Sequence, residues 1–256
     1  MIDRLSTFYE NYDEDGRLTR DNVHLVEWLT TIRYLNRLLL PNSKILDACA
    51  GAGRYSFYLA EKGHRVTACD LVEHNVSIIK SKPEAARLAD AVVCNVLDMS
   101  RFEDNSFDVV LCMGALYHLP TDAEKTQAIR ECTRVCTPGG LVVLAYLNHF
   151  AVVAQQLQER FDFFEDVLAE FEDSSDIVFK TTTPSKMEGY AKSVGLELLH
   201  NIGVDGVSYI LSEKVNTATD AAFEKWTEYI FEHCEEPSIL GYSMHGLLVG
   251  KKPVAL

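Results

Sequence analysis

The sequence predicts an α/β protein with a doubly wound, mostly parallel seven-stranded sheet, and three observations support this prediction. Short apolar segments alternate with amphipathic ones along most of the 256 residues, which is typical of parallel strands joined by crossover helices. A turn containing Gly51 and Gly53 joins the first apolar segment to a helix start. Asp70 then ends the second apolar segment, 23 residues after Asp47. Such sheets bind ligands at the carboxyl ends of their strands.

The first 40 residues are expected to form an N-terminal arm and one amphipathic helix. Apolar residues recur at helical spacing from Asp21 to Leu40, with Asp21 placed as the N-cap and Pro41 stopping the helix. The arm, residues 1–16, is polar and aromatic and ends in an acidic turn. It therefore does not have the pattern of a core element.

The rest of the chain is expected to alternate strand and helix. Expected strands are 44–49, 65–70, 91–96, 107–113, 141–147, 196–202 and 243–250, and expected helices are 54–61, 72–81, 122–136, 184–194 and 218–233. Pro138, Gly139 and Gly140 are expected to form a turn just before the fifth strand. We treat residues 1–256 as a single domain with two helical insertions, at 148–183 and 207–237.

The insertion at 148–183 has two interpretations. Its apolar stripe consists of Val153, Leu157, Phe161, Phe164, Leu168 and Phe171, and acids form the opposite face. Such a helix either packs on the sheet or forms a lid over a substrate pocket, because insertions after the fifth strand lie at the mouth of the crevice.

Composition excludes several classes of partner. The formal net charge of −14 and the lack of a basic run argue against a nucleic-acid partner. The seven cysteines occur without a CxxC pair, so we expect reduced, mostly buried thiols and no metal site. No stretch of about 18 apolar residues is present, the length that a membrane helix needs. We therefore expect a cytoplasmic protein with no membrane partner and leave its oligomeric state open.

The glycine turn points to a nucleoside-bearing cofactor. A dinucleotide fingerprint would have glycine where Ser56 stands, and Asp47 is an acid on an otherwise apolar strand. A buried carboxylate needs hydrogen-bond partners or a cationic ligand. This disfavours an NAD- or flavin-dependent oxidoreductase and favours a positively charged cofactor.

The stretch LDACAGAGRYSFYLA resembles motif I of the class I S-adenosylmethionine-dependent methyltransferases, an acid followed by GxGxG. RVCTPGG resembles the RVLKPGG of the same family, and Cys49 stands where its first glycine is expected. The resemblance covers residues 35–147 and implies a Rossmann-like fold whose last strand is antiparallel. It also implies S-adenosyl-L-methionine as the cofactor.

The resemblance implies a set of cofactor-binding residues at four strand ends. Asp70 would accept hydrogen bonds from the ribose hydroxyls, and Asn95 matches the position of an adenine-binding acid, with Asp98 as the alternative if the register shifts. The set as a whole is Asp47, Ala48, Cys49, Gly51, Gly53 and Arg54 after the first strand, Asp70 and Leu71 after the second, Asn95, Val96 and Leu97 after the third, and Met113 and Gly114 after the fourth. We expect the Cys49 side chain to face the sheet core while its backbone meets the cofactor.

The loop VLCMGALYHLP resembles that of small-molecule members of the family and makes Tyr117 and His118 the catalytic candidates. His118 is either a general base or a structural residue beside the cofactor. Other groups that could reach the pocket are Tyr9, Tyr12, Arg17, Asn148, His149 and His245.

We therefore predict a methyltransferase that transfers a methyl group in line to an oxygen, nitrogen or sulfur atom of a small molecule. A protein methyltransferase and a methyltransferase-fold binding protein without catalysis are the alternatives. The sequence leaves the acceptor atom and the need for a base open.

Overall fold

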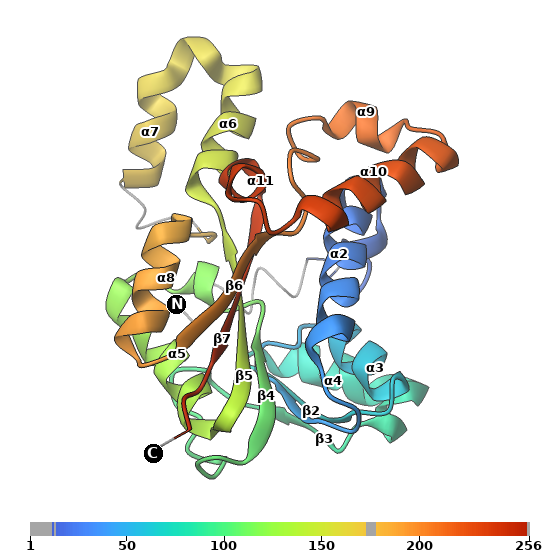
Figure 1. Ribbon diagram of the computed structural model, residues 1–256, viewed down its shortest axis with the longest axis vertical. Coiled ribbons are helices and arrows are strands. Elements are labelled where there is room, and N and C mark those ends of the chain that lie inside the picture. The colour runs from blue at the N-terminus through green and yellow to red at the C-terminus, as the bar shows by residue number, and fades with distance from the viewer. Residues whose placement is uncertain (1–11, 13, 173–177, 255–256) are drawn as a thin grey trace.

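The structure, a computed structural model, describes residues 12, 14–172 and 178–254 and contains one seven-stranded sheet (Figure 1). The strand order is β3-β2-β1-β4-β5-β7-β6. The strands are β1 (Lys44–Asp47), β2 (Arg65–Asp70), β3 (Asp90–Val93), β4 (Phe107–Cys112), β5 (Cys136–Leu147), β6 (Glu197–Gly203) and β7 (His245–Lys251). β1 to β5 pair in parallel, and β7 runs antiparallel to both β5 and β6. The predicted fold class is confirmed.

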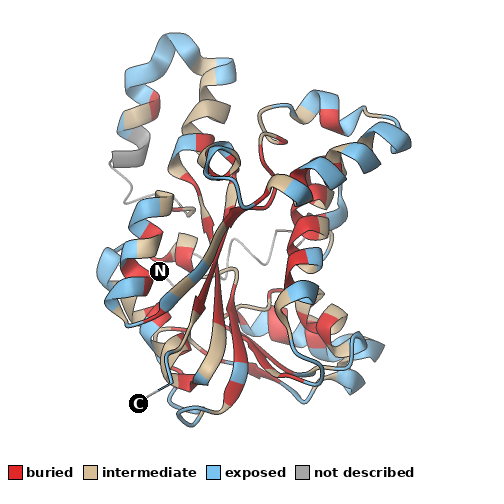
Figure 2. Cartoon of the chain, viewed as in Figure 1, coloured by how far each residue is buried: buried red, intermediate tan, exposed pale blue. Residues whose placement is uncertain are grey.

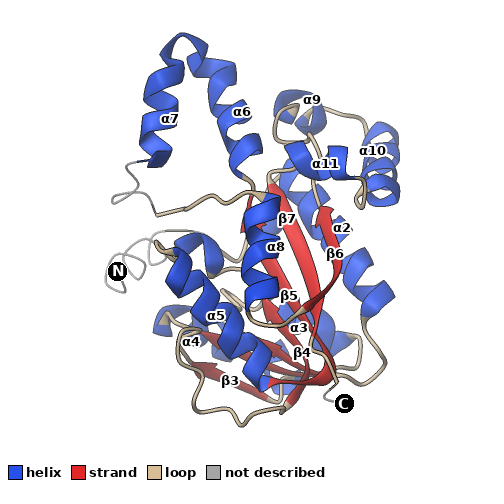
Figure 3. Cartoon of the chain, turned by 60° about the vertical axis from the view of Figure 1, so that its left-hand side comes forward, coloured by secondary structure: helices blue, strands red, loops and turns tan. Residues whose placement is uncertain are grey.

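The main helices cover both faces of the sheet (Figures 1 and 3). α3 and α4 pack on β2, α5 packs on β4 and β5, and α8 packs on β6 and β7. The helices are α2 (Asn22–Leu38), α3 (Arg54–Glu61), α4 (Glu73–Ser81), α5 (Asp122–Val135), α6 (His149–Arg160), α7 (Phe164–Glu172), α8 (Pro184–Ser193), α9 (Ser212–Asn216), α10 (Asp220–His233) and α11 (Pro237–Tyr242). α9 and α11 were not predicted, because each has at most two turns and no periodic pattern.

The first helix begins and ends where local chemistry predicts. The Asp21 carboxylate accepts a hydrogen bond from the backbone N–H of His24, which satisfies a donor that the helix itself leaves unpaired. The helix ends at Leu38, before Pro41. Its buried face, which includes Trp28, packs beside α3 and α10.

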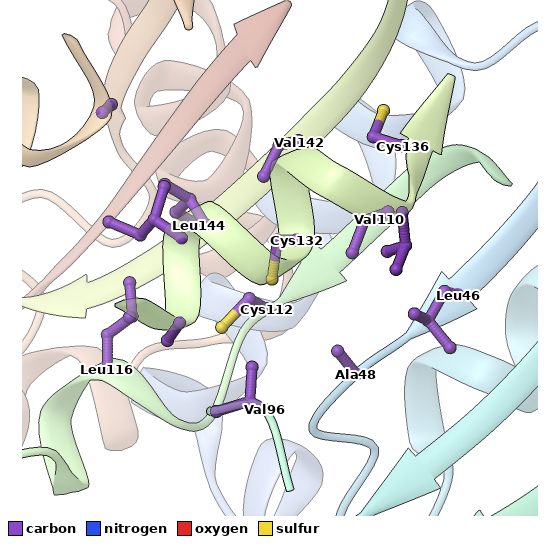
Figure 4. Close-up of a cluster of buried hydrophobic side chains, with 14 of the residues drawn as sticks. Leu46, Ala48, Val96, Val110, Cys112, Leu116, Cys132, Cys136, Val142 and Leu144 are labelled. Atoms are coloured by element: carbon purple, nitrogen blue, oxygen red, sulfur yellow. The ribbon is translucent and has the colours of Figure 1, made fainter. Parts of the chain in front are cut away.

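The sheet core lies on both faces of the central strands (Figure 2). Ile45 and Leu46 are adjacent in β1, point to opposite faces, and are both fully buried. Figure 4 shows the face under α5, where Cys112 of β4 and Cys132 of the helix lie among aliphatic side chains. All seven cysteines are free, and six of them are buried.

The prediction of a turn before the fifth strand was wrong. β5 begins at Cys136, and residues 138–140 lie inside it. The register between β4 and β5 shifts here, so that Phe107 faces Cys136 whereas Val109 faces Leu141. Gly139 takes up a positive φ of 82° and donates its N–H to the Lys252 carbonyl. The extra residues therefore form a bulge, which pairing with the chain after β7 stabilises.

The helical insertion after β5 is a hairpin and not a helix packed on the sheet. α6 ends at Arg160, a short 3-10 turn covers Phe161–Phe163, and α7 returns alongside α6 (Figures 1 and 3). Phe161 is 73% exposed and Phe164 46% exposed, although both belong to the apolar stripe of the sequence. α6 packs against α7 and α11. Periodicity predicted helical structure in this insertion, but as one helix, and could not locate the reversal between α6 and α7.

No helix in the described part of the chain is both long and apolar enough to cross a membrane.

We expect Gly246→Ala to destabilise the fold. Gly246 faces Tyr146 across the β5–β7 pair, and a Cβ at this position would lie 2.2 Å from the tyrosine ring. Tyr146 is 1% exposed and its hydroxyl donates to Asn201, so the ring has little room to move. Overpacking of this kind costs about 1–3 kcal/mol, which urea denaturation would detect as a lower transition midpoint.

Gly189→Ala is the matched control, because Gly189 lies inside α8 and a Cβ there meets no atom within 4 Å. Alanine is favoured over glycine inside a helix by about 0.5–1 kcal/mol, so this variant should be equal to or more stable than the parent. Equal midpoints for the two variants would contradict the packing argument.

Candidate functional site

A cavity of about 290 Å³ lies at the carboxyl ends of β1, β2, β3 and β4. It is lined by residues from each of these strand ends, by the start of α3, and by the segment before α2. Of the predicted site residues, the structure brings together Ala48, Cys49, Gly51, Arg54, Asp70, Leu71, Asn95, Val96, Leu97, Met113, Gly114, Tyr117 and His118. Asp47 and Gly53 do not line it.

Those two residues support the cavity from behind. The Asp47 carboxylate is 2% exposed and accepts a 2.6 Å hydrogen bond from the Ser56 hydroxyl of α3. Burial raises the pKa of Asp47 to about 6. Gly53 caps α3 with a φ of +89°, and its N–H donates to the Ala50 carbonyl. Asp47 therefore ties β1 to α3, and Gly53 closes the turn between them.

Asp70 lies at the end of β2 and is 8% exposed. Its carboxylate accepts hydrogen bonds from the backbone N–H groups of Gly51 (2.8 Å) and Val72 (2.9 Å) and from the Asn75 side chain (3.1 Å). Burial raises the pKa of Asp70, and these three donors oppose that effect. The carboxylate is thereby held in one orientation beside the glycine turn. Sequence reasoning missed Asn75, because nothing in the sequence indicates which residue of α4 faces Asp70.

Cys49 and Gly114 bring the ends of β1 and β4 together. The Cys49 sulfur lies 3.7 Å from the sulfur of Cys112, a fully buried residue of β4. A Cβ on Gly114 would lie 3.2 Å from the Cys49 carbonyl oxygen. The Cys49 side chain thus packs toward the sheet core, and glycine at 114 allows the two loops to approach.

The two candidates after β3 differ in position. Asn95 lines the cavity, and its side-chain oxygen accepts from the backbone N–H of Leu97 at 3.0 Å. Asp98 is exposed, and its carboxylate accepts from the Ser100 N–H. The geometry therefore favours Asn95 over Asp98 as the residue that meets a ligand.

Tyr117 and His118 lie in a short 3-10 turn after β4. The His118 Nδ1 atom is 3.0 Å from the Val178 carbonyl oxygen, and its ring packs on Phe179. Burial lowers the pKa of His118 to about 4, whereas burial raises that of Tyr117. At neutral pH both side chains are therefore uncharged. A base with a pKa near 4 is poorly matched to proton removal at neutral pH, so these contacts favour the structural interpretation of His118.

The segment before α2 closes one side of the cavity. Glu14, Arg17 and Leu18 line it, and a Cβ on Gly51 would lie 3.0 Å from the Glu14 side chain. Tyr55 of α3 lines it as well. Of these four, only Arg17 was named from the sequence. The acidic turn and the buried Leu18 gave no periodic signal, so their position could not be inferred.

Arg17 is held by a chain of buried charges. Its guanidinium donates two 3.0 Å hydrogen bonds to the Glu27 carboxylate. Glu27 lies 3.5 Å from the His245 Nδ1 atom, which in turn lies 2.6 Å from the Asp205 carboxylate. Asp205 is 0% exposed and Glu27 6%. His245 does not line the cavity, but Glu27 and Arg17 connect His245 to the cavity.

Other groups named from the sequence lie elsewhere. Asn148 caps α6 and donates to the carbonyls of Leu240 and Gly241. His149 contacts the Thr181 hydroxyl. Tyr12 does not line the cavity, and Tyr9 lies outside the described residues. Among the cavity-lining residues, none belongs to α6 or α7, so the expected lid at 150–173 does not cover the cavity here. The reason is that α6 packs against α11, away from the ends of β1 and β2.

A second, larger groove of about 580 Å³ lies on the outside of α3. Trp28, Phe57 and Lys82 line it, and Arg54 lines both this groove and the cavity. The groove lies away from the strand ends, where doubly wound sheets bind their ligands. Within the described ranges, no group of three or more histidine, cysteine or acidic side chains is arranged to hold a metal ion.

Comparison with known sequences identifies the central part of the chain. Residues 46–144 match the family model described as a methyltransferase domain. A ubiquinone biosynthesis O-methyltransferase of Xanthomonas oryzae pv. oryzae is 36% identical over 113 residues, which are 44% of this chain and 46% of that protein. The chain thus matches less than half the length of this curated relative.

Solved structures with this fold cover nearly the whole chain. A chain in the complex between the Haloferax volcanii Trm112 methyltransferase activator and a putative methyltransferase has a TM-score of 0.66 and 18% identity, and covers 97% of both chains. A SAM-dependent methyltransferase from Methanosarcina mazei has a TM-score of 0.60 and 18% identity, covering 87% of this chain and 98% of that one. The fold is shared although the sequences have diverged.

We expect His118 to titrate near pH 4, well below the ordinary histidine value of about 6.5. In a pH titration followed by NMR, its ring signals should keep the neutral form throughout the neutral range. Because its folded pKa is lowered, His118 contributes stability above about pH 6.5 that is lost as the pH falls toward 4. A His118 midpoint at the ordinary histidine value of about 6.5 would refute the buried, neutral ring.

Proposed function

We propose that the protein is a class I S-adenosylmethionine-dependent methyltransferase and that it transfers the methyl group of this cofactor to a small-molecule acceptor. The observation that carries the proposal is the cavity at the strand ends, which runs from Asn95 past Asp70 and Cys49 to Tyr117 and is closed beyond them by Arg17 and Leu18.

The residues of the cavity fit the cofactor that the domain and fold imply. Asp70 is a preoriented carboxylate at the end of β2, and a carboxylate offers about four acceptor positions, of which protein donors use three. One ribose hydroxyl can therefore be held directly, and a second would share an oxygen that already accepts a bond. Asn95, Val96 and Leu97 line the part of the cavity where adenine is expected. Gly51 and Gly114 line the cavity without side chains of their own.

The lining of the cavity beyond the cofactor residues supports a small acceptor. Tyr117, Tyr55 and Leu18 line this end, and concave sites with mainly apolar and aromatic linings are typical of small-molecule ligands. The O-methyltransferase names of the curated relatives agree with a small molecule, and we propose an oxygen acceptor for this chain on that basis.

The bound cofactor supplies an electrophilic methyl group on a sulfonium sulfur. What the chain contributes is alignment and exclusion of water. Leu18 and Leu119, which are 5% and 6% exposed, make the acceptor end apolar. The Tyr117 hydroxyl stays protonated and can orient an acceptor by hydrogen bonding. Neither His118 nor Tyr117 is suited to remove a proton at neutral pH.

We expect Asp70→Ala to weaken binding of S-adenosylmethionine by about 1–3 kcal/mol, because charge-assisted hydrogen bonds to the ribose are lost. Isothermal titration calorimetry would measure it. Asp90→Ala, at the exposed amino-terminal end of the neighbouring strand β3, is the control and should bind normally, because it lies away from the carboxyl ends of the strands. Unchanged affinity in Asp70→Ala would show that Asp70 does not bind the ribose. Tighter binding of NAD than of S-adenosylmethionine would show that the proposed cofactor is wrong.

Activity should appear in a screen of small acceptors with radiolabelled S-adenosylmethionine. We expect label to be transferred to phenols or carboxylic acids and not to denatured or folded proteins. Asp70→Ala should lose at least tenfold in kcat/KM at limiting cofactor. Transfer to a protein and to no small acceptor would overturn the proposed substrate class.

A further inference from the structure

A chain of buried charges ends at Arg17, which lines the cavity and has no role in the cofactor contacts proposed above. We propose that Arg17 binds the anionic oxygen of the acceptor, a phenolate or a carboxylate, and that Glu27, His245 and Asp205 position it. This inference rests on the proposed methyl transfer to an oxygen acceptor and names the charge state that the site selects.

The first argument is the position of Arg17. The adenine and ribose residues Asn95 and Asp70 follow β3 and β2, and Tyr117 follows β4 at the other end of the cavity. Arg17 lines the same cavity as Tyr117, and its positive charge opposes the rise that burial causes in the pKa of Tyr117. The chain of buried charges reaches Arg17 from His245 of β7 and from Asp205, which follows β6. β7 and β6 lie toward the edge of the sheet opposite β3. Arg17 therefore belongs to the acceptor end.

The second argument is the way in which Arg17 is held. Its side chain is 17% exposed, and Glu27 takes up two of its five N–H groups in a fixed bidentate pair. The same planar guanidinium has further donors for an atom inside the cavity. A rigid, weakly hydrated cation of this kind is suited to an oxyanion.

The third argument is the charge balance behind Arg17. Burial alone would lower the pKa of His245, but Glu27 and Asp205 raise it. Burial alone would raise the pKa of Glu27, but Arg17 and His245 lower it to about 2. Glu27 and Asp205 thus face Arg17 and His245, and the Glu14 carboxylate lies 3.9 Å from the Arg17 Nε atom as a third acid. Glu27 shares its charge between His245 and Arg17, so that it does not neutralise the guanidinium alone.

The fourth argument is that neither of the catalytic candidates, His118 and Tyr117, is suited to act as the base that a neutral acceptor needs. An ionised oxygen attacks the methyl carbon directly: the oxygen–carbon bond forms while the sulfur–carbon bond breaks, the electron pair stays on sulfur, and no proton has to be removed. A cation beside the acceptor favours the ionised form of a phenol. With a net charge of −14 the protein repels anions at long range, so an anionic acceptor needs a specific cation inside the cavity.

Three nitroaromatic probes test the proposal on the full chain with the demethylated cofactor, S-adenosylhomocysteine, present. The probes are 4-nitrophenol, 4-nitrobenzoate and neutral nitrobenzene, and binding is followed by equilibrium dialysis and by the absorbance of the phenolate. We expect both anions to bind more tightly than nitrobenzene. We also expect the bound nitrophenol to ionise at a lower pH than it does in solution.

Arg17→Gln should weaken binding of both anions at least tenfold and leave nitrobenzene within twofold. This change leaves the buried Glu27 carboxylate without its ion-pair partner. The double variant Arg17→Gln/Glu27→Gln removes both charges of the pair and must give the same result. Arg20→Gln removes the same charge from an exposed neighbour outside the cavity and is the control. Equal binding of nitrobenzene and the anions by the parent, or full anion affinity in the folded double variant, would overturn the proposal.

The positioning role of His245 has its own readout, because 4-nitrobenzoate stays ionised throughout the neutral range. As the pH rises through the raised pKa of His245, the imidazole loses its proton, and Asp205 and Glu27 lose the cation that they share. Arg17 is then the remaining cation of the cluster, and the Tyr209 ring packs on the imidazole. Nitrobenzoate affinity should therefore fall with rising pH in the parent and be low and flat in His245→Asn. A pH profile in His245→Asn that matches the parent would refute this role.

Calorimetry with S-adenosylhomocysteine separates the two levels of inference. If the cofactor product binds but the anions do not depend on Arg17, the charge selection is wrong and methyl transfer stands. If the cofactor product does not bind, the proposed function fails, and anion binding measured without it still decides whether Arg17 is an anion site.

Discussion

The adjacency of β1 and β4 is the constraint on which the site depends. β1 pairs in parallel with β2 on one side and with β4 on the other, and the helices that follow β1 and β4 cover opposite faces of the sheet. The two loops must therefore diverge, which opens a crevice at the carboxyl ends of the strands. The glycine turn, Asp70 and the Tyr117 loop all face this crevice because each directly follows a strand that ends there.

The loops after β1 and β4 approach each other closely, and small residues at their centre avoid a steric clash. Glycine at 114 lets the β4 loop pass the Cys49 carbonyl, where a Cβ would come within 3.2 Å. The Cys49 sulfur packs 3.7 Å from the sulfur of the buried Cys112. A small apolar side chain is tolerated there because the core beneath β1 and β4 has room for it.

The N-terminal segment and the last strand depend on each other through buried charge. Removing one partner of a buried ion pair costs about 3–5 kcal/mol, whereas replacing a whole pair by apolar residues is often neutral. Stability alone therefore does not require Arg17, Glu27, His245 and Asp205. Their arrangement fixes the position of a cation at the acceptor end of the crevice, and it links the closing of the cavity to the integrity of β7.

The sequence by itself determined the order and type of the main elements and the strand ends at which the cavity-lining residues occur. Period-2 and period-3.6 patterns, caps such as Asp21 and turns such as Gly51 to Gly53 are local signals, and local backbone preferences act on the same few residues. Only the tertiary structure decided that residues 138–140 form a bulge in β5, that the 149–172 segment turns back on itself, and that Glu27 lies between Arg17 and His245. The physical reason is that each of these depends on pairing and burial between segments distant in the chain, and such contacts leave no periodic trace in either partner alone.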